Sequence, residues 1–444
     1  MRTLPLVLDR SAAAPLSAQV ADQVRDLVTR GRLAPGDRLP SSRALAAEVG
    51  AARSVVEGAY AQLVAEGWLE GRHGSGTYVA AGRVPGATAD HPGAPRRRRG
   101  PDPAPLLRLD AGTPWIDPRH EAAWRRAWRE VAHTTPPRGY DDPRGLPALR
   151  EALAERLGRT RGVEADPDEV RVTGGTTSGL RHLLVALPPG AVLVDDPGYR
   201  AAAETVRTVG RQVVDHPALT PVTSLTGCAA AYVTPAHQHP LGATMPGAAR
   251  LDLLATARRD GAVLIEDDYD SEFRYDVAPV PALAGLDRGC VGYLGTTSKS
   301  VAPTLRLGWL VAPPHLLEPL DRHRALTHDS AAWPVQRAML TLLRDGYVDR
   351  VVRSARRVYA RRAARVTEVL GDHLDAPVAG MYATIRLPRD LALAAERAAA
   401  AAGFEVPLLA ELCRSADLHG LVLGFGRCTD EELDRALAAI ASVL

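Results

Sequence analysis

The only lysine in this chain, Lys299, is the residue whose type points most directly to chemistry. The sequence has 54 Lys and Arg residues, and all the others are Arg. An exposed basic position accepts Arg, whereas a Schiff base needs an amine that can lose its proton. The chain has no Asn and few Phe and Met, so codon drift explains the missing lysines but not the retained one. Lys299 therefore indicates covalent carbonyl chemistry, with a chance survivor as the alternative.

Two further segments suit a phosphate and a charged ring. Residues 174–179 follow a predicted strand and open a predicted helix, whose free N–H groups bind phosphate. Asp267 ends another predicted strand, where a carboxylate could bind magnesium or pair with a protonated pyridine nitrogen. No His or Cys cluster accompanies it, which argues against a transition metal. Together with Ser298, Lys299 and Arg306, these residues are the parts that a pyridoxal phosphate site needs.

Alternating strands and helices must position these side chains. Short apolar strands with intervening helices predict a largely parallel sheet, with ligand-binding side chains at the carboxyl ends of its strands. The strands are predicted at residues 169–173, 191–194, 229–234, 262–266, 290–295 and 308–311, with helices such as 177–186 and 245–259.

From about Leu109 to the end, the order and spacing of these motifs resemble the fold-type I aminotransferases. The resemblance implies an α/β transferase-like fold with a largely parallel sheet, a smaller C-terminal α+β subdomain, and pyridoxal 5′-phosphate as cofactor. It is strongest at residues 140–150, 196–199, 232–240, 266–274 and 295–309.

The resemblance also implies a role for each matching residue. Lys299 would form the internal aldimine, and Asp267 would pair with the pyridine nitrogen. Tyr269 would bond the ring hydroxyl, and Tyr199 would stack on the ring. Tyr140 would reach the phosphate of a partner subunit, which would make the domain an obligate dimer. The phosphate would be held by Thr176, Thr177, Ser298 and Arg306.

Two departures from the family concern turnover. Fold-type I enzymes commonly bond the ring hydroxyl with an Asn before a Pro-x-Gly. Many also grip the substrate carboxylate with a C-terminal Arg, but the corresponding stretch here is Val422 to Phe425. Arg427 is the predicted substitute, and Gly112 would lie near the effector carboxylate. These departures argue against amino-acid turnover but not against aldimine formation. The Asn would be replaced by one of His237, Gln238 and His239.

The first 80 residues predict three helices and a β-hairpin. The helices are expected at about 16–28, 43–49 and 53–66, and the hairpin strands at 68–70 and 77–79. This order is typical of a winged helix-turn-helix, whose third helix enters the major groove of DNA. A dimerisation module built from three small helices is the alternative.

Segments 38–46, 59–69 and 74–79 resemble a GntR-type DNA-binding domain. One departure is Ala52 before the recognition-helix Arg, where such domains usually carry a hydroxyl that caps the helix or contacts phosphate. Glu57 is predicted to be a solvated residue, with a contact to a cytosine amine as the alternative. The resemblance implies DNA contacts from Ser42, Arg43, Arg53, Ser54, Gly74 and Ser75.

Composition bounds the remaining possibilities. Residues 81–105 are rich in Pro and Gly and predict a linker, so the domains are expected at 1–80 and 106–444. Its Arg run, 96–99, could contact phosphates or be a solvated tether. The four cysteines show no metal-binding spacing, the N-terminus is polar, and no apolar run is long enough to cross a membrane. These features predict a cytoplasmic protein. The net charge of +2 does not by itself indicate a nucleic-acid partner.

A GntR-type winged helix, a linker and an aminotransferase-like domain in one chain resemble the MocR subfamily of transcription regulators. The resemblance implies a head-to-tail homodimer on double-stranded operator DNA. Its effector would be pyridoxal phosphate, or an amine or amino acid held as an aldimine on Lys299. Such a ligand acts only by binding two arrangements of the dimer with different affinities. A working aminotransferase with an accessory winged helix is the alternative function.

Overall fold

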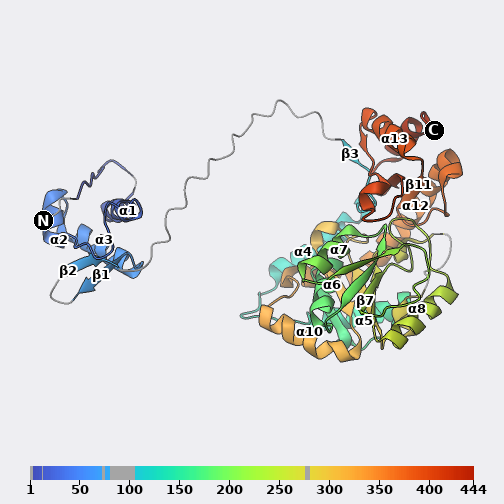
Figure 1. Ribbon diagram of the computed structural model, residues 1–444, viewed down its shortest axis with the longest axis horizontal. Coiled ribbons are helices and arrows are strands. Elements are labelled where there is room, and N and C mark those ends of the chain that lie inside the picture. The colour runs from blue at the N-terminus through green and yellow to red at the C-terminus, as the bar shows by residue number, and fades with distance from the viewer. Residues whose placement is uncertain (1–3, 13, 73–75, 81–105, 276–280) are drawn as a thin grey trace. The chain divides into compact units, whose positions relative to one another are not determined.

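The computed structural model describes residues 4–12, 14–72, 76–80, 106–275 and 281–444. Its chain divides into two compact units, Met1–Asp102 and Pro103–Leu444, which are drawn in Figure 1. The predicted linker 81–105, its Arg run 96–99, and Gly74 and Ser75 at the tip of the hairpin lie outside the described residues. Within the described ranges, no helix has the length and apolar character needed to cross a membrane.

The first unit is a winged helix-turn-helix, as the sequence predicts. Val20, Val24, Leu45, Val56 and Leu63 are fully buried and belong to its core. Its helices are α1 (Leu16–Thr29), α2 (Ser42–Glu48) and α3 (Arg53–Ala65), and the antiparallel hairpin is β1 (Leu69–Arg72) with β2 (Gly76–Val79).

The ends of two helices in this unit differ in how they are capped. Ser41 caps α2, because its hydroxyl accepts a hydrogen bond of 3.2 Å from the N–H of Ala44. Ala52 stands at the same place before α3 and has no side chain that can do so. The start of α3 therefore keeps N–H groups that its own N-cap side chain does not satisfy.

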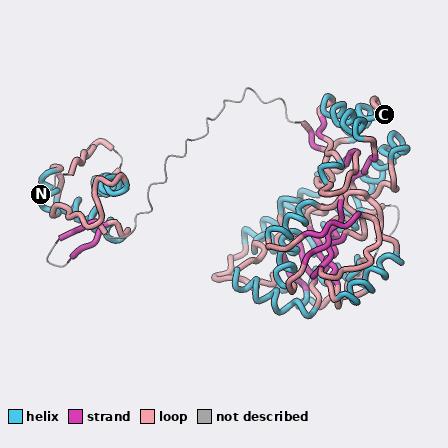
Figure 2. The backbone as a smooth tube through the Cα atoms, viewed as in Figure 1, coloured by secondary structure: helices cyan, strands magenta, loops and turns pink. Residues whose placement is uncertain are grey.

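The second unit is built on a seven-stranded sheet of order β4-β10-β9-β8-β7-β5-β6. Strand β10 is antiparallel to both of its neighbours, and the other pairs are parallel, so the sheet is largely parallel as predicted. Figure 2 shows these strands in the middle of the unit with helices around them. The strands are β4 (Val170–Thr173), β5 (Ala191–Asp196), β6 (Val213–Pro217), β7 (Cys228–Val233), β8 (Val263–Asp268), β9 (Val291–Thr296) and β10 (Gly308–Val311).

Strand β6 is an addition to the predicted set. It lies at the edge of the sheet and pairs only with β5. Its residues are exposed or half-buried, so the segment lacks the continuous apolar run that marks the inner strands. The helices of this part are α4 (Glu121–His133), α5 (Pro147–Arg161), α6 (Thr176–Ala186), α7 (Arg200–Thr208), α8 (Gly247–Asp260), α9 (Leu283–Leu286), α10 (Pro314–Thr327) and α11 (Trp333–Arg344).

The C-terminal part is a smaller α+β subdomain, as predicted. Its strands β11 and β13 pair antiparallel, with Tyr382 opposite Gly424. The short strand β3 (Leu107–Arg108) at the start of the unit pairs with β12, so the chain that follows β3 is tied to this subdomain. Its elements are α12 (Tyr347–Leu370), β11 (Tyr382–Arg386), α13 (Arg389–Ala401), β12 (Phe404–Glu405), β13 (Gly420–Gly424) and α14 (Asp430–Ala441).

Candidate cofactor site and DNA-binding surface

A cavity of about 520 Å³ lies beside the carboxyl ends of the parallel strands β7, β8 and β9. The C-terminal subdomain closes one side of it through Pro407 and Val422. This is the place where open α/β sheets bind their ligands. The cavity is lined by nine of the residues predicted for a cofactor or effector: Gly112, Thr176, Thr177, Tyr199, Asp267, Tyr269, Ser298, Lys299 and Arg306.

Three consecutive buried carboxylates end β8, and the structure separates their roles. Glu266 accepts hydrogen bonds of 3.0 Å from the N–H groups of Leu283 and Ala284 at the start of α9. Asp268 pairs with the buried guanidinium of Arg161, at 2.5 Å. Because side chains alternate along a strand, Asp267 points the other way and lines the cavity.

Asp267 has one carboxylate oxygen to spare. Its Oδ2 accepts a hydrogen bond of 2.5 Å from the hydroxyl of Tyr232. Its Oδ1 is buried and has no hydrogen-bond partner among the described residues. Burial raises the pKa of Asp267 to about 7, against the lowering effect of Tyr232. A buried acceptor without a partner is costly, so this oxygen is suited to a ligand that brings a donor or a positive charge.

Lys299 lies in the turn after β9, with its amine directed to the same cavity. Its Nζ donates a hydrogen bond of 2.5 Å to the carbonyl oxygen of Gly112, in the segment after β3. Burial lowers the pKa of Lys299 below its ordinary value, although the carboxylates of Asp270, Asp110 and Asp267 act in the opposite direction. A lowered pKa increases the fraction of neutral amine, which is the form that attacks a carbonyl.

The first turn of α6 forms a cradle for an anion at the other end of the cavity. Gly175 precedes this helix with a φ of +103°. A Cβ at Gly175 would lie 3.6 Å from Nη2 of Arg306, in ordinary van der Waals contact, so it is the φ and not the space that favours glycine here. Thr176, Thr177 and Ser298 complete the lining. Helix N–H groups, hydroxyls and a guanidinium together make a phosphate-binding arrangement.

The structure also distinguishes the three candidates that stand where the family has Asn. His237 is buried and bonds Asp270, with 2.7 Å between Nδ1 and Oδ2. The amide of Gln238 donates to Asp195 and to the carbonyl of Pro197. Only His239 of the three lines the cavity. Burial lowers the pKa of His239 to about 3, so its ring is neutral at neutral pH and has one N–H to donate.

Tyr269 faces the cavity, but its hydroxyl already has protein partners. It donates to the carbonyl of His237 at 3.0 Å and lies 2.9 Å from the hydroxyl of Tyr382 on β11. A hydroxyl has a single proton but can accept further hydrogen bonds. For Tyr269 to donate to a ligand, its proton must therefore turn away from His237.

Two predicted residues do not line the cavity of their own chain. Tyr140 lies between α4 and α5, is 87% exposed and stacks on His328 with 4.4 Å between ring centroids. Arg427 is exposed, beyond the end of β13. The buried Val422 on β13 lines the cavity instead, so β13 presents an apolar side chain there.

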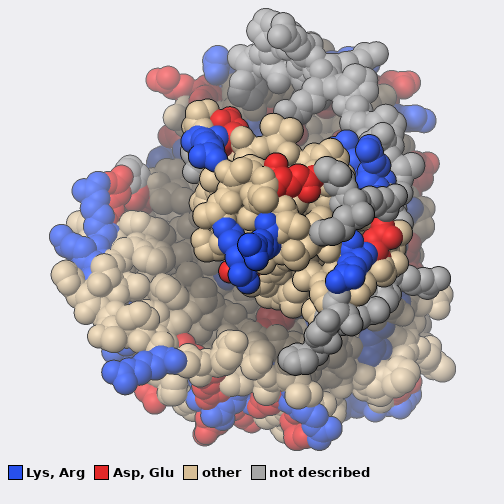
Figure 3. Space-filling view, turned by 90° about the vertical axis from the view of Figure 1, so that its left-hand side faces the viewer, with Lys and Arg blue, Asp and Glu red and all other residues tan. Residues whose placement is uncertain are grey.

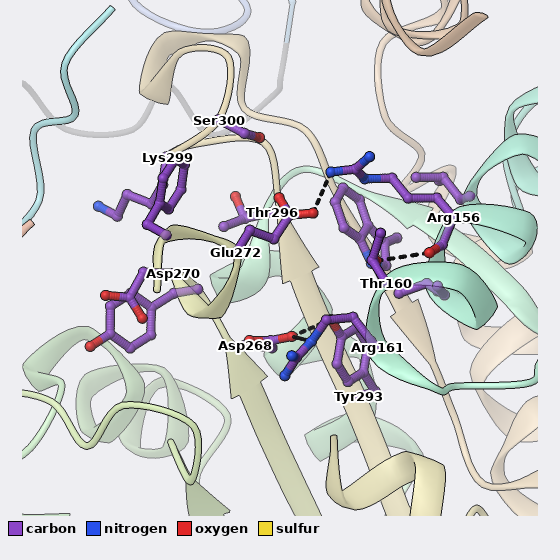
Figure 4. A pocket seen from close by; sticks show the side chains of 15 residues that line it. Arg156, Thr160, Arg161, Asp268, Asp270, Glu272, Tyr293, Thr296, Lys299 and Ser300 are labelled. Atoms are coloured by element: carbon purple, nitrogen blue, oxygen red, sulfur yellow. Dashed lines mark hydrogen bonds and ion pairs between the residues drawn. The ribbon is translucent and has the colours of Figure 1, made fainter. Parts of the chain in front are cut away.

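Buried ion pairs hold the back of the site. Figure 4 shows Arg156 and Arg161, both from α5, reaching toward Glu272 in the loop after β8 and toward Asp268 at the end of β8. Arg156 pairs with Glu272, and Arg161 pairs with Asp268, which also accepts from the hydroxyl of Tyr293 at 2.5 Å. These contacts fix the loop that carries Asp270, beside Lys299. Sequence reasoning missed this support, because the partners lie more than a hundred residues apart.

The predicted DNA contacts that the structure describes lie at the starts of α2 and α3. Arg43, Arg53 and Ser54 are exposed, and Ser42 is half-buried. Glu57 is exposed as predicted, but its carboxylate is engaged: it pairs with Nε of Arg53 at 2.8 Å and accepts from Ser42 at 3.4 Å. Figure 3 shows Lys and Arg interspersed with Asp and Glu over the face turned to the viewer, in keeping with the small net charge.

Both units match known protein families. Residues 16–79 match the model described as "Bacterial regulatory proteins, gntR family", and residues 105–440 match "Aminotransferase class I and II". Among solved structures, the chain is 25% identical to aspartate aminotransferase from Thermus thermophilus with maleate, with a TM-score of 0.66 over 77% of this chain and 92% of that one. It is also 25% identical to the α-aminoadipate aminotransferase LysN of Thermus thermophilus, complexed with N-(5′-phosphopyridoxyl)-L-leucine, with a TM-score of 0.64 over 76% and 92%.

Curated relatives match this chain across both units. The HTH-type pyridoxine biosynthesis transcriptional regulator PdxR of Corynebacterium glutamicum is 33% identical over 99% of this chain and 98% of its own. The probable rhizopine catabolism regulatory protein MocR of Rhizobium meliloti is 32% identical over 98% and 95%. The chain belongs to the MocR subfamily of GntR-type transcription regulators, with a winged helix-turn-helix and an aminotransferase-like domain of fold type I.

Proposed function

We propose that this regulator binds pyridoxal phosphate on Lys299 and that the bound cofactor changes its affinity for operator DNA. The observation that carries the proposal is the pairing, in one cavity, of the only lysine with the unpartnered buried oxygen of Asp267. The pyridine nitrogen of the cofactor, when protonated, can donate the hydrogen bond that this oxygen does not receive from the protein. The name of the corynebacterial relative, a pyridoxine biosynthesis regulator, supports the same cofactor chemistry.

Each end of the cavity suits one part of this cofactor. The first turn of α6, Ser298 and Arg306 would hold the phosphate, and Tyr199 would lie against the ring. His239 or Tyr269 would bond the ring hydroxyl. The cofactor, when bound, supplies an aldehyde that condenses with a primary amine and a ring that withdraws electrons. Tyr140 would contact a partner subunit, which its 87% exposure supports.

We favour pyridoxal phosphate itself as the effector over an amino acid. Val422 occupies the strand position where a carboxylate-binding Arg is common in aminotransferases, and Arg427 does not line the cavity. Arg108 and Arg200 also line the cavity, and their guanidinium groups would bind an amine that carries a negative charge more weakly. Because the cavity lacks this Arg, we also place the turnover of amino acids second to cofactor sensing.

A working aminotransferase is the second candidate function, and the complete set of cofactor-binding residues favours it. The two candidates differ in what the loaded protein does with common amino acids and 2-oxo acids. Steady transamination at enzyme-like rates, of about 1–1000 per second, would make the catalytic function primary. A single slow half-reaction, with no release of the second product, agrees with a sensor.

Substitution of Lys299 tests the proposal directly. Wild-type protein mixed with pyridoxal phosphate should develop a visible absorbance band, and Lys299→Ala should not, because no other side chain carries a primary amine. Lys299→Arg is the matched control, since it keeps the charge without the nucleophile. Borohydride reduction followed by peptide mass analysis should label a side chain only at residue 299.

The regulatory half of the proposal needs DNA. Affinity for the segment upstream of the gene should change on addition of pyridoxal phosphate in the wild type, and should not change in Lys299→Ala or Lys299→Arg. A wild type that binds the cofactor covalently while its DNA affinity stays constant would refute sensing and leave cofactor binding intact. A wild type without the absorbance band would refute the covalent site.

A further inference from the structure

The segment before α1 is attached to that helix as if it were a β-strand. The N–H and C=O of Val7 bond the side-chain amide of Gln23, at 2.9 and 2.7 Å. Those of Asp9 bond the amide of Gln19 in the same way, at 2.9 and 2.9 Å. Each glutamine thus exchanges two hydrogen bonds with one residue, as an opposite residue does in a β-ladder.

The spacing of this ladder explains why it fits. Two residues of extended chain span about 6.7 Å, and four residues of helix span about 6 Å. The distance from Val7 to Asp9 therefore matches the distance from Gln23 to Gln19. The alternation of residues 4–9 agrees, because the even-numbered ones face the core and the odd-numbered ones are exposed. The inward side chains are Leu4, Leu6 and Leu8.

This attachment brings Arg10 to the turn of the helix-turn-helix. The carboxylate of Asp9 accepts from the N–H of Ser11 at 2.8 Å, which turns the chain directly after the ladder. Nη2 of Arg10 then donates to the carbonyl oxygen of Gly50, at 2.5 Å. Gly50 lies between α2 and α3, three residues before Arg53.

The charge of Arg10 is not neutralised. Among the residues that the structure describes, Arg10 is exposed and forms no ion pair, whereas Arg25, Arg30 and Arg53 each pair with a carboxylate. Its bond to Gly50 uses one of the five N–H donors of a guanidinium. A terminal segment normally frays, but the ladder and the buried Leu4 hold this one in a defined position.

We propose that the attached segment 4–10 is an arm of the DNA-binding surface and that Arg10 contacts a backbone phosphate beside the groove that α3 enters. A phosphate accepts the remaining guanidinium donors and supplies the missing negative charge. The contact reads no bases and sets the register of α3 on the duplex. The inference rests on the proposed function only in that the protein binds DNA.

The alternative is that Arg10 only caps the carbonyl at the end of α2. Arg10→Gln keeps a neutral amide donor but removes the charge, so it tests the part of the role that depends on charge. Arg10→Lys keeps the charge. If Arg10 contacts phosphate, Arg10→Gln and Arg10→Ala should weaken binding roughly tenfold at low salt, and Arg10→Lys should restore most of the affinity.

The test is the salt dependence of DNA affinity, measured with the full-length protein on its upstream segment and on a random-sequence duplex. Removal of Arg10 should reduce the slope of log affinity against log salt by about 0.9 for each winged helix that is bound, on both DNAs. Arg30→Ala is the matched control, because it removes a charge about 16 Å further along α1 than Gln19. It should leave the slope unchanged.

A second variant tests the arm independently of Arg10. Gln19→Leu with Gln23→Leu removes the ladder but keeps good helix-forming residues. This double variant should weaken binding as much as Arg10→Ala does, and adding Arg10→Ala to it should have little further effect. An unchanged slope in Arg10→Ala, or full binding in Arg10→Gln, would overturn the inference. Failure of the wild type to bind either DNA would instead refute the proposed function.

Discussion

At the scale of single residues, the site shows how one carboxylate among three is kept for a ligand. Glu266 and Asp268 lie on one face of β8, away from the cavity. Both oxygens of Glu266 accept from N–H groups, and Oδ2 of Asp268 binds Arg161, while its Oδ1 has no hydrogen-bond partner among the described residues. Asp267 lies on the other face and has only Tyr232. The buried oxygen of Asp267 that faces the cavity without a partner is unfavourable for the protein alone. Such an oxygen is tolerated in a binding site when the bound ligand supplies its hydrogen-bond donor.

This arrangement predicts a pH dependence of stability. The pKa of Asp267 is raised from 3.8 to about 7 by burial, so between these values the folded protein holds a proton that the unfolded chain has released. Stability of the cofactor-free protein therefore falls as pH rises through this window. At one pKa unit per about 1.4 kcal/mol, the decrease reaches roughly 4 kcal/mol above pH 7. Asp267→Asn removes this decrease.

The measurement is thermal unfolding of the cofactor-free wild type and Asp267→Asn from about pH 4 to about pH 8. The difference between the two cancels the contributions of other groups, such as Glu266, whose pKa burial also raises to about 7. The stability of Asp267→Asn relative to the wild type should increase as pH rises. A constant difference across the range would show that Asp267 is not perturbed in the folded protein.

At the scale of elements, the anion cradle depends on how α6 begins. Gly175 has a φ of +103°, a backbone conformation that residues with a Cβ rarely adopt, and it lies beside the guanidinium of Arg306. Gly175→Ala should therefore lower stability by about 1–2 kcal/mol and weaken the binding of inorganic phosphate and of pyridoxal phosphate.

Gly158 supplies the matched control for this prediction. It lies inside α5, and nothing would come within 4 Å of a Cβ there. Gly158→Ala should raise stability by up to about 1 kcal/mol, because alanine favours the helix, and should leave phosphate affinity unchanged. Unfolding curves and phosphate titrations of both variants decide the point. Equal phosphate affinity in Gly175→Ala and wild type would show that the start of α6 does not bind the phosphate.

At the scale of the whole molecule, each unit has a core of its own. The buried residues of the first unit, such as Val24 and Leu63, form a cluster that contains no residue of the second. Residues 1–80 should therefore fold as an isolated fragment. If the large units pair, two winged helices are linked in one particle, and the second binds its half-site at a high effective concentration.

The isolated fragment should accordingly bind the upstream DNA about 100- to 10,000-fold more weakly than the full chain. Gel-shift titration gives both affinities, and sedimentation of each protein gives the number of chains in the particle. Circular dichroism confirms that the fragment is folded. A folded fragment that binds as tightly as the full chain would show that pairing of the large units does not contribute to DNA binding.

Local signals in the sequence predicted the fold and nine of the residues that line the cavity. Helical periodicity located α1, α2 and α3, and apolar runs located the inner strands, because neighbouring residues carry both patterns. The single lysine and the glycines before α6 marked the chemistry, since no other residue type can replace them. The edge strand β6 was missed, because partial exposure removes the apolar run.

Long-range packing was needed to choose which of several equivalent residues face the cavity. It placed His239 there rather than His237 or Gln238 and left Arg427 outside. Of the three carboxylates that end β8, it placed only Asp267 at the cavity. These outcomes depend on partners distant in sequence, such as Asp270 for His237. The same holds for Arg10, which meets Gly50 across forty residues. The sequence specifies which side chains are present, and contacts between distant segments specify where they point.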